Sequence, residues 1–166
     1  MADRPAPPGR SPHITAEGQR RLLDESAALW ARRADVVKAL AAAAAEGDRS
    51  ENAEYIYRKK ELREIDRRIR YLQKRLPELK VVSGAPADTT RVYFGAWVTV
   101  EDDAGVELSF RIVGADEIDP ARHWISVDSP VARAVLRRAI DDELTVRTPG
   151  GEVRYCVVDV RYEPAD

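Results

Sequence analysis

Two consecutive stretches of the chain repeat apolar residues at heptad spacing, and this pattern constrains the fold more than any other feature. The first stretch steps by 4 and 3 through Leu23, Ala27, Trp30, Ala34, Val37, Ala41 and Ala44. The second stretch steps by 3 and 4 through Tyr55, Arg58, Leu62, Ile65, Ile69, Leu72, Leu76 and Leu79. This is the coiled-coil period, so each stretch is predicted to be a helix with one apolar seam.

Only a few residues separate the two predicted helices, so they must fold back on each other as an antiparallel hairpin. Thr15 is the predicted N-cap of the first helix, and Pro77 places the end of the second at about residues 76–79. About 30 residues per helix make an arm roughly 45 Å long. We therefore predict a coiled-coil arm over residues 14–80, with an acidic tip at its far end.

After a linker at residues 81–90, the pattern changes from helical to strand-like. Apolar and β-branched runs occur at residues 92–100, 108–113, 124–127, 144–148 and 153–160. A short helix is predicted at residues 130–139, with Pro130 at its first position. The expected fold class is therefore α+β: an N-terminal antiparallel two-helix coiled coil, then a small domain with a predominantly antiparallel sheet over residues 91–163. The proline-rich residues 1–13 are predicted to be a disordered lead.

The charge of the chain is segregated along its length. The net charge is −2, but residues 1–54 carry −1, residues 55–80 carry +6 and residues 81–166 carry −7. The excess of positive charge in residues 55–80 indicates an anionic partner for the second helix, although the net charge of the whole chain is negative. Five cations step by 3 and 4 along the helix face opposite the seam, and we call them the basic stripe: Lys60, Arg63, Arg67, Arg70 and Lys74.

The basic stripe has two interpretations. It could be an ordinary solvated face, stabilised by pairs such as Glu64–Arg68 within the helix. Five positions of one sign on one face favour an anionic partner instead. Because no base-reading motif accompanies the stripe, a phosphate backbone is the preferred partner.

The tip sequence GDRSEN carries two carboxylates, Asp48 and Glu51, three residues apart. From spacing alone the favoured interpretation is a capping box, with Asp48 as N-cap of the second helix and Glu51 at its third position; Ser50 is an alternative cap. The other interpretation is a weak Mg²⁺ site, because both carboxylates can share one side of the turn. Mg²⁺ takes six oxygens, so another molecule would have to complete such a site.

Several functional classes are excluded. No apolar run approaches the roughly 18 residues of a membrane span, and the N-terminus lacks the apolar core of a secretory signal. The single cysteine, Cys156, rules out an internal disulfide, and with only His13 and His123 it cannot form a typical zinc site. Phosphate-binding loops, nucleophile elbows and paired-cysteine motifs are absent. We expect a cytoplasmic protein.

The tip and second helix, GDRSENAEYIYRKKELREIDRRIRYLQKR, resemble the bacterial Gre transcript-cleavage factors. The arginine in the tip and the dense basic run after it are typical of the GreB branch. Further stretches are similar to the second domain of the family: VYFGAWV at 92–98, FRIVGADEI at 110–118 and ISVDSPVARAVL at 125–136. The resemblance extends, in order, over residues 14–163.

The resemblance implies a fold and a function. Proteins of this family have an N-terminal antiparallel coiled coil and a C-terminal FKBP-like domain. The globular domain docks at the rim of the secondary channel of RNA polymerase, and the coiled coil delivers its tip to the active centre. The polymerase then cleaves backtracked nascent RNA. The resemblance therefore implies a monomeric cofactor of the polymerase rather than an enzyme.

The resemblance also assigns residues. Asp48 and Glu51 would act at the active centre on a second Mg²⁺ held jointly with the polymerase, with Ser50 and Asn52 supporting them. The basic stripe would lie near the displaced 3′ end of the nascent RNA. A further pair, Asp128 and Pro130, would belong to the polymerase-docking surface.

Two other functions are possible for such a chain, and the sequence differs from the usual pattern of the family at two places. A secondary-channel regulator that does not induce cleavage would share the fold, but the intact Asp48–Glu51 pair argues against it. A peptidyl-prolyl isomerase rests on analogy of fold alone. The lead is longer than is usual in the family, and Asp141 stands where the family commonly has Gly, while Asp142 keeps the acid of that turn.

Overall fold

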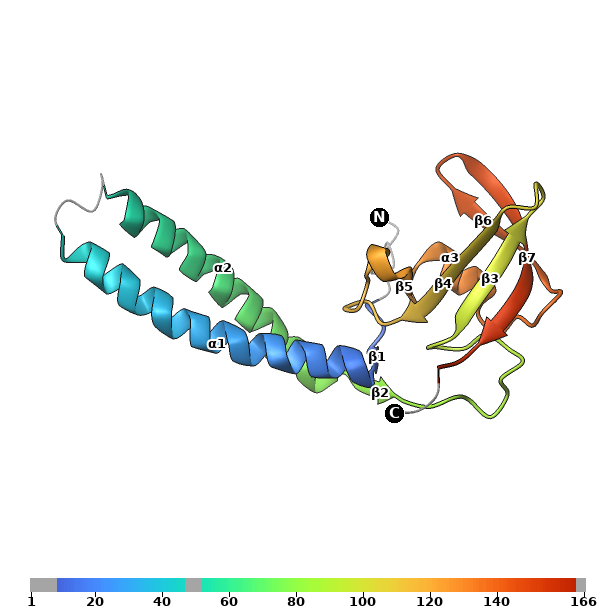
Figure 1. The fold of residues 1–166 in the computed structure, drawn as a ribbon, viewed down its shortest axis with the longest axis horizontal. Coiled ribbons are helices and arrows are strands. Elements are labelled where there is room, and N and C mark those ends of the chain that lie inside the picture. The colour runs from blue at the N-terminus through green and yellow to red at the C-terminus, as the bar shows by residue number, and fades with distance from the viewer. Residues whose placement is uncertain (1–8, 47–51, 164–166) are drawn as a thin grey trace, which may run out of the picture. The chain divides into compact units, whose positions relative to one another are not determined.

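The structure is a computed structural model that describes residues 9–46 and 52–163 (Figure 1). The chain divides into two compact units. The first, here called the arm, is Gln19–Leu79, and the second, the globular unit, comprises residues 1–18 and 80–166. Over the described part of the chain, no helix combines the length and the apolar character that crossing a membrane requires.

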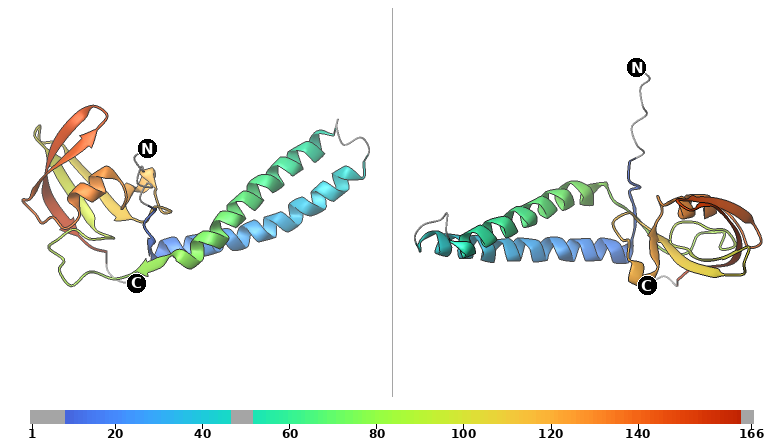
Figure 2. Two further views of the ribbon diagram at one scale, coloured as in Figure 1. Left: turned by 180° about the vertical axis from the view of Figure 1, so that it is seen from behind. Right: turned by 90° about the horizontal axis from the view of Figure 1, so that it is seen from above.

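The arm consists of two antiparallel helices that lie side by side in every view (Figures 1 and 2). Helix α1 spans Ala16–Ala44 and helix α2 spans Ala53–Arg75, followed by one 3-10 turn, η1, at Leu76–Glu78. The end of α2 agrees with the predicted stop at residues 76–79. At the other end, the Gly18 N–H donates to Thr15 Oγ1 at 3.0 Å, which confirms the predicted N-cap of α1.

The seam predicted for α2 is confirmed. Ile65, Ile69 and Leu72 are buried in the middle of the helix. Ile65 and Ile69 pack with Val36 of α1, and Leu62 lies against the same cluster. The apolar heptad row of α2 therefore faces α1, as its period requires.

The seam predicted for α1 is wrong by one residue. Its large members Leu23, Trp30 and Val37 are 51%, 48% and 40% exposed. The residues turned away from solvent come one position earlier in each heptad: Leu22, Leu29, Val36 and Ala43. Helix α1 thus carries two adjacent apolar rows with the same spacing. The period alone cannot distinguish them, and packing against α2 selects one.

Three ion pairs across the arm fit this register: Arg32–Glu61, Arg33–Asp66 and Arg68–Glu25, at 2.6, 2.7 and 2.6 Å. The hydrogen bond from Arg32 is the main cause of a lowered pKa of the Glu61 carboxyl. Because the folded-state pKa is lowered, the contribution of Glu61 to stability is present at neutral pH and is lost as the pH falls through that pKa.

The register of α1 predicts opposite outcomes for two neighbouring valines. Val36 is 1% exposed and Val37 is 40% exposed, although both belong to apolar heptad rows. Changing Val36 to Ala should lower the free energy of unfolding by about 2 kcal/mol, because two buried methyl groups are lost. Changing Val37 to Ala should alter it by less than about 0.5 kcal/mol. Urea titration of the two variants measures both values, and equal losses would contradict the register.

The globular unit is built on a five-stranded sheet with the order β5-β4-β3-β7-β6. The strands are β3 Trp97–Asp102, β4 Glu107–Val113, β5 Trp124–Ser126, β6 Glu143–Thr148 and β7 Gly151–Arg161. All neighbours pair antiparallel except β4 and β5, which confirms the predominantly antiparallel sheet. Strand β3 begins later than the predicted residue 92, because the chain first turns at Gly95, where φ is 88°.

The apolar core of the globular unit lies between this sheet and helix α3, Pro130–Val135. The sheet contributes fully or almost fully buried side chains from β3, β4, β6 and β7: Val98, Val100, Phe110, Ile112, Leu144, Val146 and Val157. Ala132 and Val135 of α3 pack against them. One further 3-10 turn, η2 at Pro120–Arg122, precedes β5.

Helix α3 is shorter than the predicted residues 130–139, because Arg137 takes a left-handed conformation with φ of 69°. The turn after α3 contains Asp141 at the position where the resemblance leads us to expect a glycine. Asp141 adopts φ of 74°, and its N–H donates to the Val157 carbonyl at 2.8 Å. The Asp142 carboxylate accepts from the Ala139 N–H at 2.8 Å, so hydrogen bonds on both sides of Asp141 stabilise this turn.

A small parallel sheet joins the two chain segments that enter and leave the arm. Strand β1, His13–Thr15, pairs with β2, Lys80–Val82. The sequence pattern places His13 in the lead and residues 81–82 in the linker, so this sheet was not predicted. A strand of three residues is too short for the alternation of apolar and polar residues to be recognised in the sequence.

Candidate functional site

The ends of α1 and α2 next to the tip are joined by one side chain, Asn52. Its Oδ1 accepts from the Tyr55 N–H at 3.1 Å, which makes Asn52 the N-cap of α2. Its Nδ2 donates to the Ala43 carbonyl at 2.8 Å, in the last turn of α1. The amide thus caps the first turn of α2 and adds a second hydrogen bond to the Ala43 carbonyl, which also accepts from the Glu46 N–H at 3.3 Å.

This cap corrects the favoured interpretation of the tip. Asp48 is not the N-cap of α2, because the helix begins at Ala53 and Asn52 caps it. The tip carboxylates are therefore not needed to start the helix. Asp48, Ser50 and Glu51 themselves lie outside the described residues.

The oxygen ligands available near the tip can fill only part of the coordination sphere of a Mg²⁺ ion. The Asn52 amide uses both its oxygen and its nitrogen in capping. Within the described ranges, no three His, Cys, Asp or Glu side chains gather closely enough to hold a metal ion. Two carboxylates, from Asp48 and Glu51, would remain as ligands. Such a set suits an ion that a second molecule also holds.

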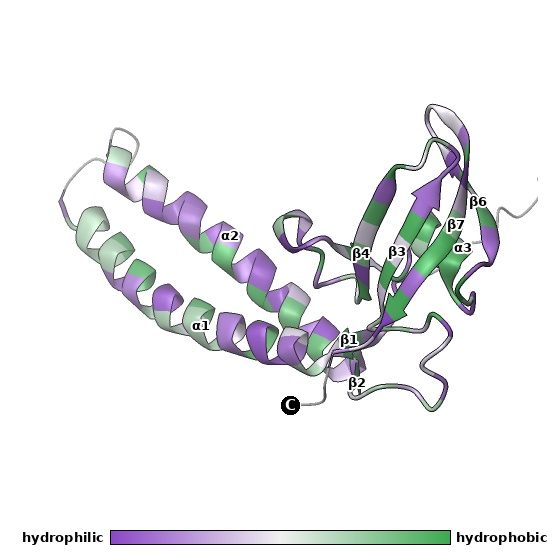
Figure 3. Ribbon diagram, turned by 45° about the vertical axis from the view of Figure 1, so that its right-hand side comes forward, coloured by the Kyte–Doolittle hydropathy of each residue, from purple (hydrophilic) through white to green (hydrophobic). Residues whose placement is uncertain are grey.

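The basic stripe lies on the exposed side of α2 throughout its length. All five of its side chains are exposed: Lys60, Arg63, Arg67, Arg70 and Lys74. Figure 3 shows the strongly hydrophilic character of α2 beside the more apolar α1. Among the described residues, none of the five makes an ion pair. Their charges are therefore available to a partner.

The alternative explanation of the stripe is weakened by the pairing of Arg68. This residue bonds Glu25 on α1 through two nitrogens, at 2.6 and 2.9 Å. Arg68 thus joins α2 to α1, whereas the alternative explanation invoked a pair within α2. Cations at the inner edge of α2 hold the arm together, and those on the outer face remain free for other contacts.

Residues near the tip include features that the sequence analysis missed. Arg58 is the one charged member of the heptad row of α2; it is half-buried and pairs with Glu54 and Glu61 at 2.8 and 3.0 Å, so its charge is neutralised within the arm. Ile56 and Tyr57 are 54% and 60% exposed in the first turns of α2. Their position outside the heptad row was the available signal that they face solvent.

The two predicted docking residues lie at the start of α3. Pro130 is exposed at the first position of the helix, and the Ser129 side chain accepts from the Ala132 N–H as its N-cap. Asp128 is half-buried, and its Oδ2 accepts from the Ser11 N–H at 3.0 Å. Asp128 therefore has a role within the chain as well as the predicted role at an interface.

These two roles of Asp128 can be separated with two substitutions. Asp128→Asn keeps an oxygen that can accept from Ser11 and removes the charge, whereas Asp128→Arg removes both. If the carboxylate docks on the polymerase, Asn should weaken binding by about 1 kcal/mol, or roughly 5-fold, and Arg by more. Competition binding measures both, with Asp159→Asn on β7 as a charge-matched control. Unchanged affinity of the Asn variant would remove Asp128 from the interface.

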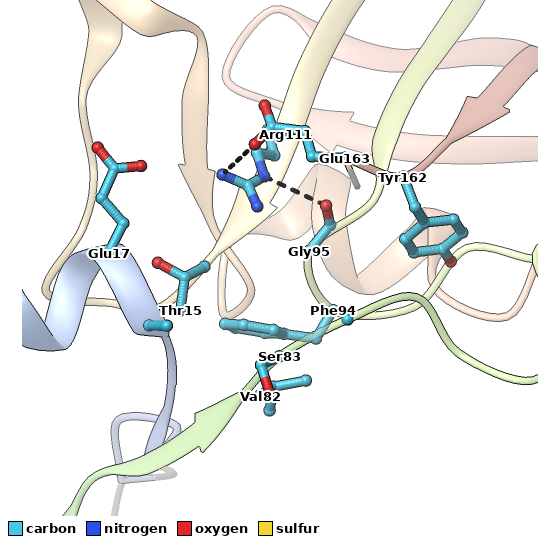
Figure 4. Close-up of a pocket in the computed structure, with 11 residues that line it drawn as sticks. Thr15, Glu17, Val82, Ser83, Phe94, Gly95, Arg111, Tyr162 and Glu163 are labelled. Carbon is cyan, nitrogen blue, oxygen red and sulfur yellow. Dashed lines mark hydrogen bonds and ion pairs between the residues drawn. The ribbon is translucent and has the colours of Figure 1, made fainter. Parts of the chain in front are cut away.

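A cavity of about 400 Å³ opens within the globular unit beside β1 and β2 (Figure 4). Arg111 lies in its wall, donating to the Gly95 carbonyl at 3.2 Å and pairing with Glu163 at 3.5 Å. The aromatic part of the lining is Phe94 and Tyr162. This mixture of charged and aromatic groups differs from the apolar, aromatic-lined pocket that the isomerase interpretation requires.

Comparison with known proteins identifies relatives along the whole chain. Residues 13–81 match the family described as Transcription elongation factor, N-terminal, and residues 87–162 match Transcription elongation factor, GreA/GreB, C-term. The chain is 55% identical over 163 residues to transcription elongation factor GreB of Pseudomonas aeruginosa, covering 98% of this chain and 97% of that protein. It is 58% identical over 151 residues to GreB of Xanthomonas axonopodis, covering 90% of each.

Among solved structures, the chain is similar to the crystal structure of GreA factor homolog 1 of Thermus thermophilus. The two share 24% sequence identity with a TM-score of 0.43, over 92% of this chain and 99% of the other.

Proposed function

The chain belongs to the GreA/GreB family of transcription elongation factors, and we propose that it stimulates RNA cleavage by placing its arm in the secondary channel of bacterial RNA polymerase. It is a cofactor of the polymerase and not itself an enzyme. The observation that carries the proposal is the antiparallel arm, which brings the acidic tip sequence between the adjacent ends of α1 and α2. Cleavage of backtracked nascent RNA then releases arrested complexes.

The tip supplies carboxylates to a reaction that the polymerase performs. Asp48 and Glu51 would hold a second Mg²⁺ jointly with the polymerase, and Ser50 would support them. When bound, this ion makes its water more acidic and stabilises negative charge on the scissile phosphate. Asn52 contributes by fixing the two helix ends between which the carboxylates are carried.

The remaining surfaces have complementary roles. The basic stripe attracts the phosphate backbone of the displaced 3′ RNA segment, because its five exposed cations are unpaired among the described residues. Asp128 and Pro130 contribute to docking of the globular unit on the polymerase. The protein acts as a monomer in the cytoplasm, where its polymerase works.

The test is a cleavage assay on purified backtracked elongation complexes. Addition of the factor should release a short RNA fragment that carries the 3′ end, and the shortened transcript should then be extended. Polymerase binding without fragment release would contradict the proposal and would support the alternative, a channel-binding regulator that does not induce cleavage. Light scattering of the purified protein tests the monomeric state.

A further inference from the structure

Helix α1 carries a second apolar row, which its neighbour α2 does not cover. We call it the outer row, and its members are Leu23, Ala27, Trp30, Ala34, Val37 and Ala41. All of them are exposed, and the three large side chains are exposed by 40% or more. The row spans about 27 Å along the helix axis. An exposed apolar surface of this kind indicates a site that another molecule covers.

The spacing of the outer row indicates what kind of molecule covers it. The row steps by 4 and 3 residues, which is the seam of a coiled coil, so the partner is a helix. Every second member is alanine, and small side chains let two helices approach closely. The row takes no part in the buried cluster of Val36, Ile65 and Ile69 that joins α1 to α2. Figure 3 shows α1 in paler and greener shades than the largely purple α2.

The large and small members of the outer row alternate in an order that fits a second, reversed copy. When two copies of α1 lie antiparallel with Trp30 level with Ala34 of the other, every layer combines one alanine with one larger side chain. These layers are Leu23–Ala41, Ala27–Val37 and Trp30–Ala34, each formed twice. Parallel copies would stack alanine on alanine and tryptophan on tryptophan, which leaves voids in some layers and crowds others. Side-chain volume therefore favours the antiparallel pair.

Charges beside the outer row match in the same alignment. Asp24 and Lys38 each follow a large member of the row, and Asp24 of one copy comes within two residues of the level of Lys38 of the other. Among the described residues, neither makes an ion pair. On the other flank the Arg33 side chains of the two copies approach each other, but each is already paired with Asp66 of its own arm at 2.7 Å.

We propose that the outer row of α1 is a self-association surface, which pairs antiparallel with the outer row of a second copy of this chain. A face that matches its own reverse fits the two-fold symmetry of a dimer. Six side chains per copy bury less than the roughly 800 Å² per partner of a stable interface, so we expect a weak dimer with a dissociation constant of about 100 µM. Below that concentration the chains are monomers, the form that the proposed function uses.

Sedimentation equilibrium of the full chain tests the surface. The average mass should rise from one chain toward two, with the midpoint near about 100 µM. Trp30→Gln should weaken the association by about 10-fold or more, because the largest side chain of the row is lost. Ile56→Gln is the matched control, since Ile56 is 54% exposed on α2 and lies outside the row; it should associate like wild type. A monomer at every concentration would overturn the proposal, as would Trp30→Gln associating like wild type.

Two charge reversals test the antiparallel orientation. Asp24→Lys and Lys38→Glu should each weaken self-association by about 5-fold, because like charges then meet twice in the dimer. An equal mixture of the two variants should associate at least as well as wild type, because one copy then carries both positive charges and the other both negative charges. A mixture that associates no better than either variant alone would overturn the antiparallel pairing.

A polymerase helix is the competing occupant of the outer row. In that case Trp30→Gln would weaken polymerase binding and the wild-type chain would stay monomeric, which would overturn self-association. If the row pairs with a second copy, Trp30→Gln should bind the polymerase and stimulate cleavage like wild type in dilute assays, because the tip is unchanged. A wild-type chain that dimerises but stimulates no cleavage would support the self-association surface and contradict the proposed function alone.

Discussion

Changing Asp48 to Asn is expected to reduce factor-stimulated RNA cleavage by about 100-fold to 1,000-fold, the usual cost of removing one electrostatic contact with a transition state. The substitution keeps the size of the side chain and removes its charge. Stability should not change, because Asn52, and not Asp48, caps α2. The measurement is the rate of 3′ fragment release from backtracked complexes at saturating factor.

The matched control for this change is Glu46→Gln. Glu46 is an exposed acid just before the tip and outside the Asp48–Glu51 pair. The Glu46→Gln substitution should leave the cleavage rate unchanged, although it changes the net charge by the same amount as Asp48→Asn. If Asp48→Asn cleaves at the wild-type rate while binding normally, the metal role of the tip is wrong.

A triple change of Arg63, Arg67 and Arg70 to Gln is expected to impair rescue of deeply backtracked complexes by about 10-fold or more. These arginines are exposed on α2, so the arm should stay folded. Three lost phosphate contacts should also reduce the slope of log affinity against log salt by about 2. Cleavage of shallowly backtracked complexes should survive, because the tip carboxylates are unchanged. The rates on the two substrates are measured in parallel over a series of salt concentrations.

The control for the stripe removes the same charge from the other helix. Arg20, Arg21 and Lys38 are exposed cations of α1, and changing them to Gln should affect neither substrate. Equal losses on deep and shallow substrates for the stripe variant would show instead that the stripe contacts the polymerase. The RNA-guiding role would then be abandoned.

The sequence predicted the helices of the arm more accurately than the way they face each other. Helix α2 has a single apolar row among charged residues, so its period determined its buried face. Helix α1 has two such rows, and Val36 was distinguishable from Val37 only through its contacts with Ile65 and Ile69. When a helix has two apolar rows with the same spacing, its contacts with the partner helix decide which row is buried.

Site features formed by residues close together in the sequence were predicted correctly, whereas features that depend on contacts between distant residues were not. The basic stripe is a pattern within one helix, and all five of its residues are exposed as predicted. The favoured interpretation from spacing made Asp48 the cap of α2, whereas Asn52 takes the role, because the helix begins at Ala53; Asn52 also bonds the Ala43 carbonyl of α1. The buried hydrogen bond from the Thr15 N–H to the Glu117 carboxylate, at 3.1 Å, was not predicted, because the two residues lie 102 positions apart in the sequence. No spacing rule connects residues at that separation.

The role of the tip in metal binding can be measured by titrating Mg²⁺ against the cleavage rate of one backtracked complex. Wild-type factor should shift the midpoint to lower Mg²⁺ concentration, because in the proposed role Asp48 and Glu51 would add ligands to an ion that the polymerase also holds. The double variant Asp48→Asn/Glu51→Gln should return the midpoint to that of the polymerase without factor. A wild-type curve with the factor-free midpoint and only a higher plateau would contradict the proposal that the tip carboxylates complete the metal site.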